Sequence, residues 1–195
     1  MKKRILPLTL MLYSQLTWAD GKVGVDVGSV QENRSATNLS SQTRNAYDGY
    51  LQVRLVKSLG GINDFALNLD VGYLSTSSHE GYTGGVSETI TTSNPYLGFS
   101  YQFFRKSPIG FNLGVAYSPF VEATYSNSAA SDAYKGTATI AKAGLSAAFT
   151  ESVGLAVSVL YYSGSFTPKS NPQTTNVSNL TSSFFIPMVG LNYIF

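Results

Sequence analysis

The chain has 195 residues, of which 12% are charged and 13% are aromatic, and it contains no cysteine, which excludes disulfides and thiol catalysis. Its formal charge of +2 comes from basic residues near the N-terminus, so the rest lacks the basic footprint of a nucleic-acid-binding protein. Beyond this N-terminal segment no stretch reaches the 18 or so apolar residues of a transmembrane helix.

The first nineteen residues have the layout of a secretory signal peptide. Lys2, Lys3 and Arg4 form a basic start, residues 5–16 form an apolar run, and residues 17–19 form a cleavage site ending in alanine. The apolar run is too short for a membrane anchor, which needs ~20 residues. We therefore expect a signal peptide at 1–19 and a single domain at 20–195, and that domain carries a formal charge of −1.

Eight stretches of alternating apolar and polar residues follow, and each is predicted to be a β-strand. They cover residues 22–30, 46–57, 65–74, 94–104, 109–117, 137–149, 153–162 and 184–195. Long polar connections alternate with short turns along the chain. The long ones are 31–45, 75–92, about 122–136 and 163–180, and the short ones are 60–64, 105–108 and 150–152. This pattern predicts an antiparallel up-and-down sheet with both termini on the short-turn side.

Two architectures fit this alternation: a soluble sandwich or barrel with its apolar faces inside, and a transmembrane barrel with its apolar faces outside. The polar faces are rich in Gly, Ala and Ser, as a narrow lumen requires, whereas soluble surfaces are rich in Lys and Glu. The apolar faces carry no charge in any strand core, where Lys or Arg would cost ~2–4 kcal/mol in lipid. These features favour an all-β fold, an eight-stranded antiparallel up-and-down transmembrane β-barrel.

Aromatic residues on the apolar faces gather at the strand ends, as in the interfacial girdles of membrane barrels. The predicted ring at the short-turn end contains Phe65, Tyr101, Phe103, Phe111, Phe149, Tyr193 and Phe195, and the opposite ring contains Tyr47, Tyr73, Tyr117 and Tyr161. A soluble core has no reason to sort aromatic residues by height, so the girdles also favour the membrane barrel.

The chain resembles the small eight-stranded outer-membrane proteins of Gram-negative bacteria, of the OmpX, OmpW and opacity-protein kind. The likeness covers the whole mature chain as an architecture, and its most specific part is the C-terminal segment with Gly190, Leu191, Tyr193 and Phe195. This segment is similar to the signal by which the outer-membrane assembly machinery recognises its clients. The resemblance implies a monomer in the outer membrane, in contact with outer-membrane lipids including lipopolysaccharide.

Six charged residues are predicted on the lumen side, with the last acidic one near the upper rim. They are Asp26, Asp48, Arg54, Asp70, Glu122 and Lys142. Asp26 and Arg54 lie at similar heights on neighbouring strands, so we expect them to pair. An eight-stranded barrel is barely wide enough for its own side chains, which favours a compensated plug of charges over the alternative, a gated polar path.

A second group of inward residues is bulky and apolar, near the top of the last two strands. It consists of Leu160, Tyr162, Phe184, Ile186 and Met188. Ordinary packing inside a narrow lumen is favoured. The alternative, suggested by the OmpW resemblance, is an apolar pocket for a lipid or a small hydrophobic molecule.

Three prolines interrupt strands of a barrel that has no edge. Because proline removes a ladder hydrogen bond, we expect Pro95, Pro119 and Pro187 to mark the rim or a bulge.

His79 is the single histidine and lies in a predicted loop. Residues adjacent on one loop seldom hold the geometry of a nucleophile and its base, so a solvated histidine is favoured. No motif for a metal, phosphate or nucleotide is present, and we expect neither a cofactor nor an enzyme. The favoured function is a structural or surface-interaction role that displays four long polar extracellular loops to a ligand. The alternatives are a narrow channel or binding barrel for small hydrophobic or polar solutes, and a lipid-modifying enzyme.

Overall fold

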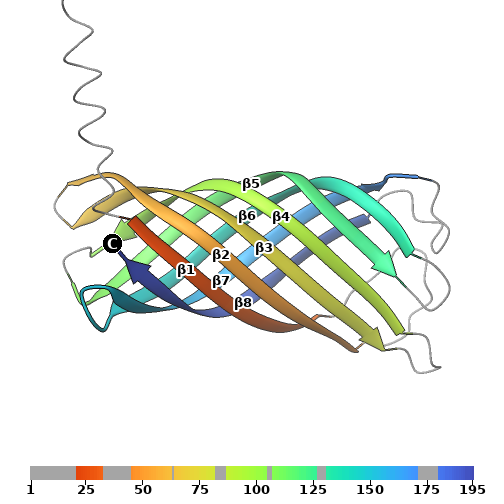
Figure 1. Cartoon of the computed structure of the whole chain (residues 1–195), viewed down its shortest axis with the longest axis horizontal. Coiled ribbons are helices and arrows are strands. Elements are labelled where there is room, and N and C mark those ends of the chain that lie inside the picture. The colour runs from red at the N-terminus through yellow and green to blue at the C-terminus, as the bar shows by residue number, and fades with distance from the viewer. Residues whose placement is uncertain are drawn as a thin grey trace, which may run out of the picture.

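The computed structural model describes residues 21–32, 45–62, 64–81, 87–104, 107–126, 131–170 and 180–195. The expected signal peptide at 1–19 lies outside these residues. The described part forms a closed barrel whose strands are strongly inclined to its long axis (Figure 1). The strands are β1 (Gly21–Glu32), β2 (Asn45–Ile62), β3 (Phe65–Gly81), β4 (Ser87–Phe103), β5 (Ile109–Ser126), β6 (Ser131–Ala148), β7 (Val153–Pro168) and β8 (Leu180–Ile194). Within the described residues, no helix is long and apolar enough to cross a membrane.

Every strand pairs antiparallel with its neighbours in sequence, and β8 pairs with β1 to close the ring. The closing register runs from Lys22 opposite Ile194 to Gly28 opposite Met188. At the end of the barrel that carries the short turns, called the lower end from here on, Gly21 and Phe195 exchange two backbone hydrogen bonds of 3.0 Å. The last residue is therefore a full member of the sheet, and the predicted eight-stranded up-and-down barrel is confirmed.

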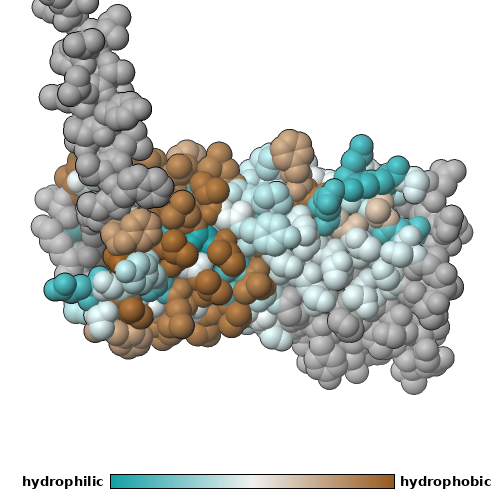
Figure 2. Space-filling model, in the orientation of Figure 1, coloured by the Kyte–Doolittle hydropathy of each residue, from teal (hydrophilic) through white to brown (hydrophobic). Residues whose placement is uncertain are grey.

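The barrel wall is apolar on its outside over the half that carries the short turns and the C-terminus (Figure 2). Here the outward residues of β7, from Val153 to Tyr161, alternate with buried small or polar ones such as Ser158. In a soluble protein these exposed Val, Leu and Phe side chains would reduce solubility. The apolar stretch of each strand has about the length of the ~9–11 tilted residues that cross a bilayer. We call this lipid-facing zone the apolar belt.

Aromatic rings cluster at the lower edge of the apolar belt. Phe103 contacts Phe65, Tyr101 and Phe111 with ring centroids 4.9–5.8 Å apart, and Tyr193 lies 6.4 Å from Phe195. Tyr73, Tyr117 and Tyr161 are exposed at the upper edge, whereas the side chain of Tyr47 lies outside the described part. The two predicted girdles are thus present.

The strands continue far beyond the apolar belt, and this corrects the expected loops. Of the segment 75–92, β3 takes residues up to Gly81 and β4 resumes at Ser87, while β5 and β6 run to Ser126 and from Ser131. The polar sequence of these segments indicated loops, but in this upper zone the alternation persists with reversed polarity. Outward positions such as Thr137 and Thr139 are polar, and inward ones such as Ala138 and Ile140 are apolar, as in a soluble barrel.

A β-bulge on β5 accounts for two of the prolines. The register of β5 shifts against β6 between Ser118 and Val121, and against β4 between Ser93 and Leu97. Pro119 lies within this bulge, and the Ser118 hydroxyl donates a hydrogen bond of 2.6 Å to the carbonyl of Pro95, replacing a lost ladder bond. Pro187 lies one residue beyond the last β1–β8 pair, where no donor is needed on that side. The expectation of a bulge is confirmed for Pro95 and Pro119, whereas Pro187 lies at neither a bulge nor the rim, since it pairs with Val159 within an unbroken β7–β8 register.

Candidate functional site in the barrel lumen

A network of paired charges crosses the lumen at the height of the apolar belt. Asp26 on β1 is fully buried and accepts hydrogen bonds from Arg54 on β2 at 2.8 Å and from Lys142 on β6 at 3.0 Å, both through Oδ2. Arg54 also donates to Asn192 on β8, and Lys142 donates to Gln52 on β2, at 2.8 and 2.9 Å. The expected pair of Asp26 and Arg54 is present, and the network links the strands on both sides of the closing seam.

The second carboxylate oxygen of Asp26 is buried without a hydrogen-bond partner because it rests on Gly190. A Cβ built at Gly190 would lie 1.9 Å from this oxygen and 2.7 Å from the carbonyl of Val25. Only glycine allows this approach. Gly190, expected from its place in the C-terminal segment to serve assembly, therefore also has a packing role inside the folded barrel.

Below the charge network the lumen opens toward the short-turn end. A cavity of about 50 Å³ beside Arg54 and Lys142 adjoins one of about 220 Å³ nearer the mouth, and Lys22, Asn68 and Gln102 line both. The Lys22 ammonium donates to Gln102 across the lumen at 3.1 Å. Asp70 lines the inner cavity, and one of its oxygens has no hydrogen-bond partner. This half of the lumen is a blind polar vestibule.

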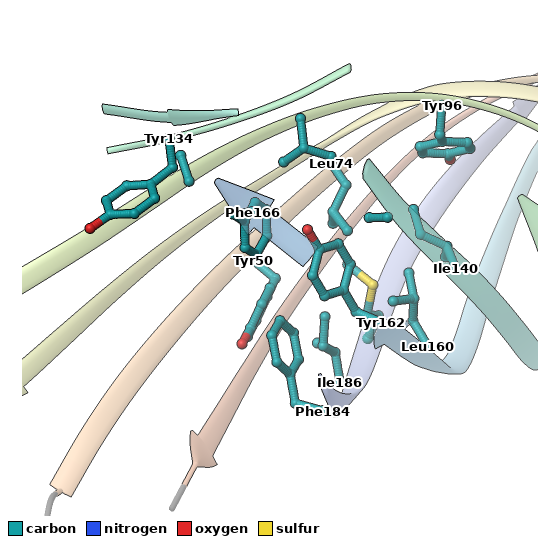
Figure 3. Packing of buried hydrophobic residues seen from close by; sticks show 14 of the residues in the cluster. Tyr50, Leu74, Tyr96, Tyr134, Ile140, Leu160, Tyr162, Phe166, Phe184 and Ile186 are labelled. Atoms are coloured by element: carbon teal, nitrogen blue, oxygen red, sulfur yellow. The ribbon is translucent and has the colours of Figure 1, made fainter. Parts of the chain in front are cut away.

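Above the charge network the lumen is filled by packed apolar side chains (Figure 3). Tyr162 stacks on Phe184 with centroids 5.0 Å apart, and Phe184 contacts Tyr50 at 5.4 Å. The Tyr162 hydroxyl donates to Asn94 at 2.8 Å, so the polar tip is satisfied within the cluster. The five bulky residues singled out in the sequence, Leu160, Tyr162, Phe184, Ile186 and Met188, all belong to this cluster and are at most 8% exposed.

Glu122 does not face the lumen, contrary to the prediction. It is exposed on the outer wall, where its carboxylate accepts a hydrogen bond of 2.7 Å from Lys169. The bulge inserts one residue into β5 below it, and a shift of one residue moves every following side chain to the opposite face. The lysine's hydrogen bond and charge lower the pKa of Glu122 below its ordinary value of 4.5. The side chains of Asp48 and His79 lie outside the described part of the structure, although both residues belong to strands.

The sequence did not single out several residues that complete the site. Gln52, Tyr96 and Asn192 extend the charge network, since Gln52 also donates to the Tyr96 hydroxyl at 2.6 Å. Further members of the apolar cluster lie in segments assigned to loops. The alternation of apolar and polar residues could have predicted them, because Val121, Ala123 and Tyr125 on β5 occupy every second position and are buried.

Within the described side chains, no group of three or more His, Cys, Asp and Glu could hold a metal ion. From the lower to the upper end, the lumen contains the polar vestibule, the paired charges and the packed apolar cluster.

Comparison with solved structures finds the same architecture in outer-membrane proteins. The crystal structure of Neisserial surface protein A matches 90% of this chain and 97% of its own, with a TM-score of 0.57 and 17% identity. The outer membrane protein OprG from Pseudomonas aeruginosa matches 93% and 98%, with a TM-score of 0.54 and 13% identity. No sequence-family model matches the chain, and no curated protein sequence matches it. At these identities the likeness concerns the fold: the chain has the eight-stranded antiparallel β-barrel fold that these outer-membrane proteins share, with an apolar outer wall suited to lipid.

Proposed function

We propose that the protein is a sealed outer-membrane scaffold that holds a polar barrel extension and its loops at the cell surface. The packed cluster in the upper lumen carries this proposal: Leu160 and Ile186 have no exposed surface, and Tyr162 is only 1% exposed. A side-chain cluster of this density leaves no room for a hydrated solute in the described part of the lumen. The charge network below it adds a second barrier, since its ions are already paired.

Conductance across a planar bilayer tests whether the barrel is sealed. We expect near-zero conductance for the wild-type protein and for Lys142→Met, because the apolar cluster closes the lumen independently of the lysine. Steady open-channel currents in the wild type would refute the sealed scaffold. Currents in Lys142→Met alone would show that the charge network, rather than the cluster, is the barrier.

The surface role requires a separate experiment. Shortening the connections that follow Glu32, Gly81, Ser126 and Ser170, one at a time, is expected to reduce binding of the cells to a surface ligand without changing barrel abundance. Heat-modifiable mobility on gels reports folding of each variant. Unchanged binding in all four variants would leave the chain a purely structural barrel.

A binding role for small polar solutes is a second candidate, and the vestibule of about 220 Å³ favours it. Its wall offers amide and hydroxyl groups from Asn68, Gln102 and Ser146. Native mass spectrometry of the purified barrel should then show a retained polar solute that is lost in Ser146→Leu. A wild-type barrel without any retained solute would remove this candidate.

We propose no enzymatic activity. The charged groups of the network, Asp26, Arg54 and Lys142, are held as ion pairs and are not arranged as a nucleophile beside a base. His79→Ala is therefore expected to leave the lipid A profile of the cells unchanged. A changed profile would restore the lipid-modifying alternative.

A further inference from the structure

The inner cavity of the vestibule, beside Arg54 and Lys142, is hollow because two neighbouring strands carry small residues there. Gly114 and Ala116 on β5 and Gly144 on β6 line it, and none of them has a side chain beyond Cβ. Its volume of about 50 Å³ leaves room for roughly three to five atoms of the size of a water molecule, since one water needs ~10–15 Å³. The cavity can therefore take one end of a small solute.

Two polar residues that line this inner cavity have atoms without a hydrogen-bond partner in the described part of the barrel. Ser158 on β7 is only 4% exposed, and its hydroxyl makes no hydrogen bond. Asp70 on β3 has one buried carboxylate oxygen in the same condition. Because β3 and β7 are four strands apart in a ring of eight, the two residues border the cavity from opposite walls. Buried polar atoms without a partner are destabilising, so a ligand that donates to both residues is favoured.

Further polar groups extend from the inner cavity into the larger one of about 220 Å³. Asn68, Gln102, Ser146 and Asn192 line both cavities. Side-chain amides and hydroxyls donate as well as accept hydrogen bonds. The two adjoining cavities therefore suit a solute that carries several groups of the same double capacity along its length.

The charges around the cavities disfavour an ionic solute. Among the described side chains that line them, the charged ones are Lys22, Arg54, Lys142 and Asp70. A cation would meet three cations, and an anion would have to compete with Asp26 for Arg54 and Lys142. Either ion would also lose its hydration, which costs far more for a charge than for a neutral polar group. The free acceptors thus favour an uncharged donor, and a hydroxyl group has this chemistry.

We infer that the vestibule binds a neutral polyol of up to about monosaccharide size, with hydroxyl groups at Ser158 and Asp70 in the inner cavity and the rest of the molecule in the larger one. This inference rests on the second candidate function, the binding of small polar solutes, and names the class of solute. It assigns Ser158, which the sequence did not single out, as a binding residue.

Three sugars of similar shape and different charge test the class of solute. D-glucose is neutral, D-glucosamine carries an ammonium group and D-glucuronate carries a carboxylate. Equilibrium dialysis of the full mature barrel in micelles against each radiolabelled sugar measures its dissociation constant. We expect glucose to bind about tenfold more tightly than either ion, because each ion would be desolvated without a partner of its own. Tighter binding of an ion, or no binding of glucose, would overturn the inference.

Removal of a single hydroxyl tests where the sugar lies. Ser158→Ala is expected to weaken glucose binding about two- to tenfold, the loss of one net hydrogen bond. Thr76→Val is the matched control, because it removes a lumen hydroxyl that bonds Thr92 and lines neither cavity. The control should bind glucose like the wild type, and heat-modifiable mobility on gels reports folding of both variants. Unchanged binding in Ser158→Ala, or an equal loss in the control, would overturn the site.

The outcomes separate this inference from the functions proposed above. A vestibule that retains a charged solute in place of glucose would preserve the binding role and exclude the polyol. A vestibule that contains only water would exclude both. Neither result bears on the sealed scaffold, because both cavities lie below the apolar cluster and conductance tests that cluster separately.

Discussion

Asp26 shows how a single residue organises the lumen. Its carboxylate holds Arg54 and Lys142 from opposite sides of the barrel, and its second oxygen packs on the Cα of Gly190. A buried ion pair contributes little net stability, but removing one partner leaves an uncompensated charge that costs about 3–5 kcal/mol. Substitutions around Asp26 are therefore limited in two ways: its charge must stay paired, and there is no room for a side chain at Gly190.

Gly190→Ala is expected to destabilise the folded barrel by about 1–3 kcal/mol, because the new methyl group would displace the Asp26 carboxylate and meet the backbone of Val25. Urea unfolding in micelles measures the free energy of unfolding. Gly110→Ala is the matched control on the lumen side, since its Cβ would meet first the flexible amide of Gln102 at 3.1 Å. An equal loss in both variants would count against the special role of Gly190.

The pair of Glu122 and Lys169 predicts a weak pH dependence of stability. Because its pKa is lowered in the folded barrel, Glu122 contributes stability above the ordinary value of 4.5, and this contribution is lost as the pH falls through the folded pKa. NMR titration of the Glu122 carboxyl should show its pKa rising toward 4.5 in Lys169→Gln. High salt should reduce the difference, since the pair is exposed. An unchanged pKa in the variant would refute the pair.

At the scale of the element, the bulge on β5 decides which way the upper half of that strand faces. Below it Asn112 and Gly114 line the lumen cavity and Val115 faces lipid, whereas above it Val121 and Tyr125 are buried and Glu122 is exposed. Three residues separate the outward Tyr117 from the inward Val121, whereas an even number would separate them in a regular strand. Because of this extra residue, the apolar side chains of upper β5 face inward, like those of the neighbouring strands.

Inserting one alanine between Val121 and Glu122 should reverse the part of β5 above the bulge. Glu122 would then enter the apolar cluster, and a buried carboxylate without a partner costs several kcal/mol. We expect loss of the heat-shifted folded form on gels. Deleting Phe120, which lies in the bulge and is 76% exposed, is the control: β5 then advances by two residues from Ser118 to Val121, as β6 does from Ala138 to Gly136, so Glu122 stays outside and the barrel should fold. A stable insertion variant would show that the facing of the upper part of β5 is not decisive.

The whole molecule is a barrel with two zones of opposite polarity. On the outside the lower zone is apolar and the upper zone is polar (Figure 2). Inside, the lower zone holds the polar network and the upper zone the apolar cluster. The lower zone, surrounded by lipid, buries its polar side chains, and the upper zone, surrounded by water, buries its apolar side chains. Within the described residues, one continuous sheet therefore spans the membrane and extends beyond it.

Deleting Phe195 is expected to reduce surface levels in cells more than it reduces stability of the refolded barrel. The two hydrogen bonds to Gly21 contribute about 0.5–1.5 kcal/mol each, which the remaining β1–β8 pairs can absorb. Surface labelling and urea unfolding measure the two effects. Phe149→Ala, which removes another exposed girdle ring, should leave both nearly unchanged. Wild-type surface levels after the deletion would contradict an assembly role for the last residue.

Local alternation was sufficient to predict the strands in the apolar belt, their lipid-facing residues and the girdles. It failed above the apolar belt, where the segment 75–81 contains no apolar residue and therefore indicates a loop, although it continues β3. Of the site, the pair of Asp26 and Arg54 was predictable from neighbouring strands of similar height. Lys142 lies 116 residues from Asp26, and no local pattern indicates that the two meet.

The sequence by itself determined the fold class, because a period of two with one apolar face is a property of each strand alone. It also determined that Phe195 lies in the lower girdle, since its phase follows from Tyr193 and Leu191. Only the tertiary structure decided which charges pair across the lumen and on which face Glu122 lies. These depend on closure of the barrel, on strand register and on a one-residue bulge, which are relations between strands and leave no trace in the alternation of any one of them.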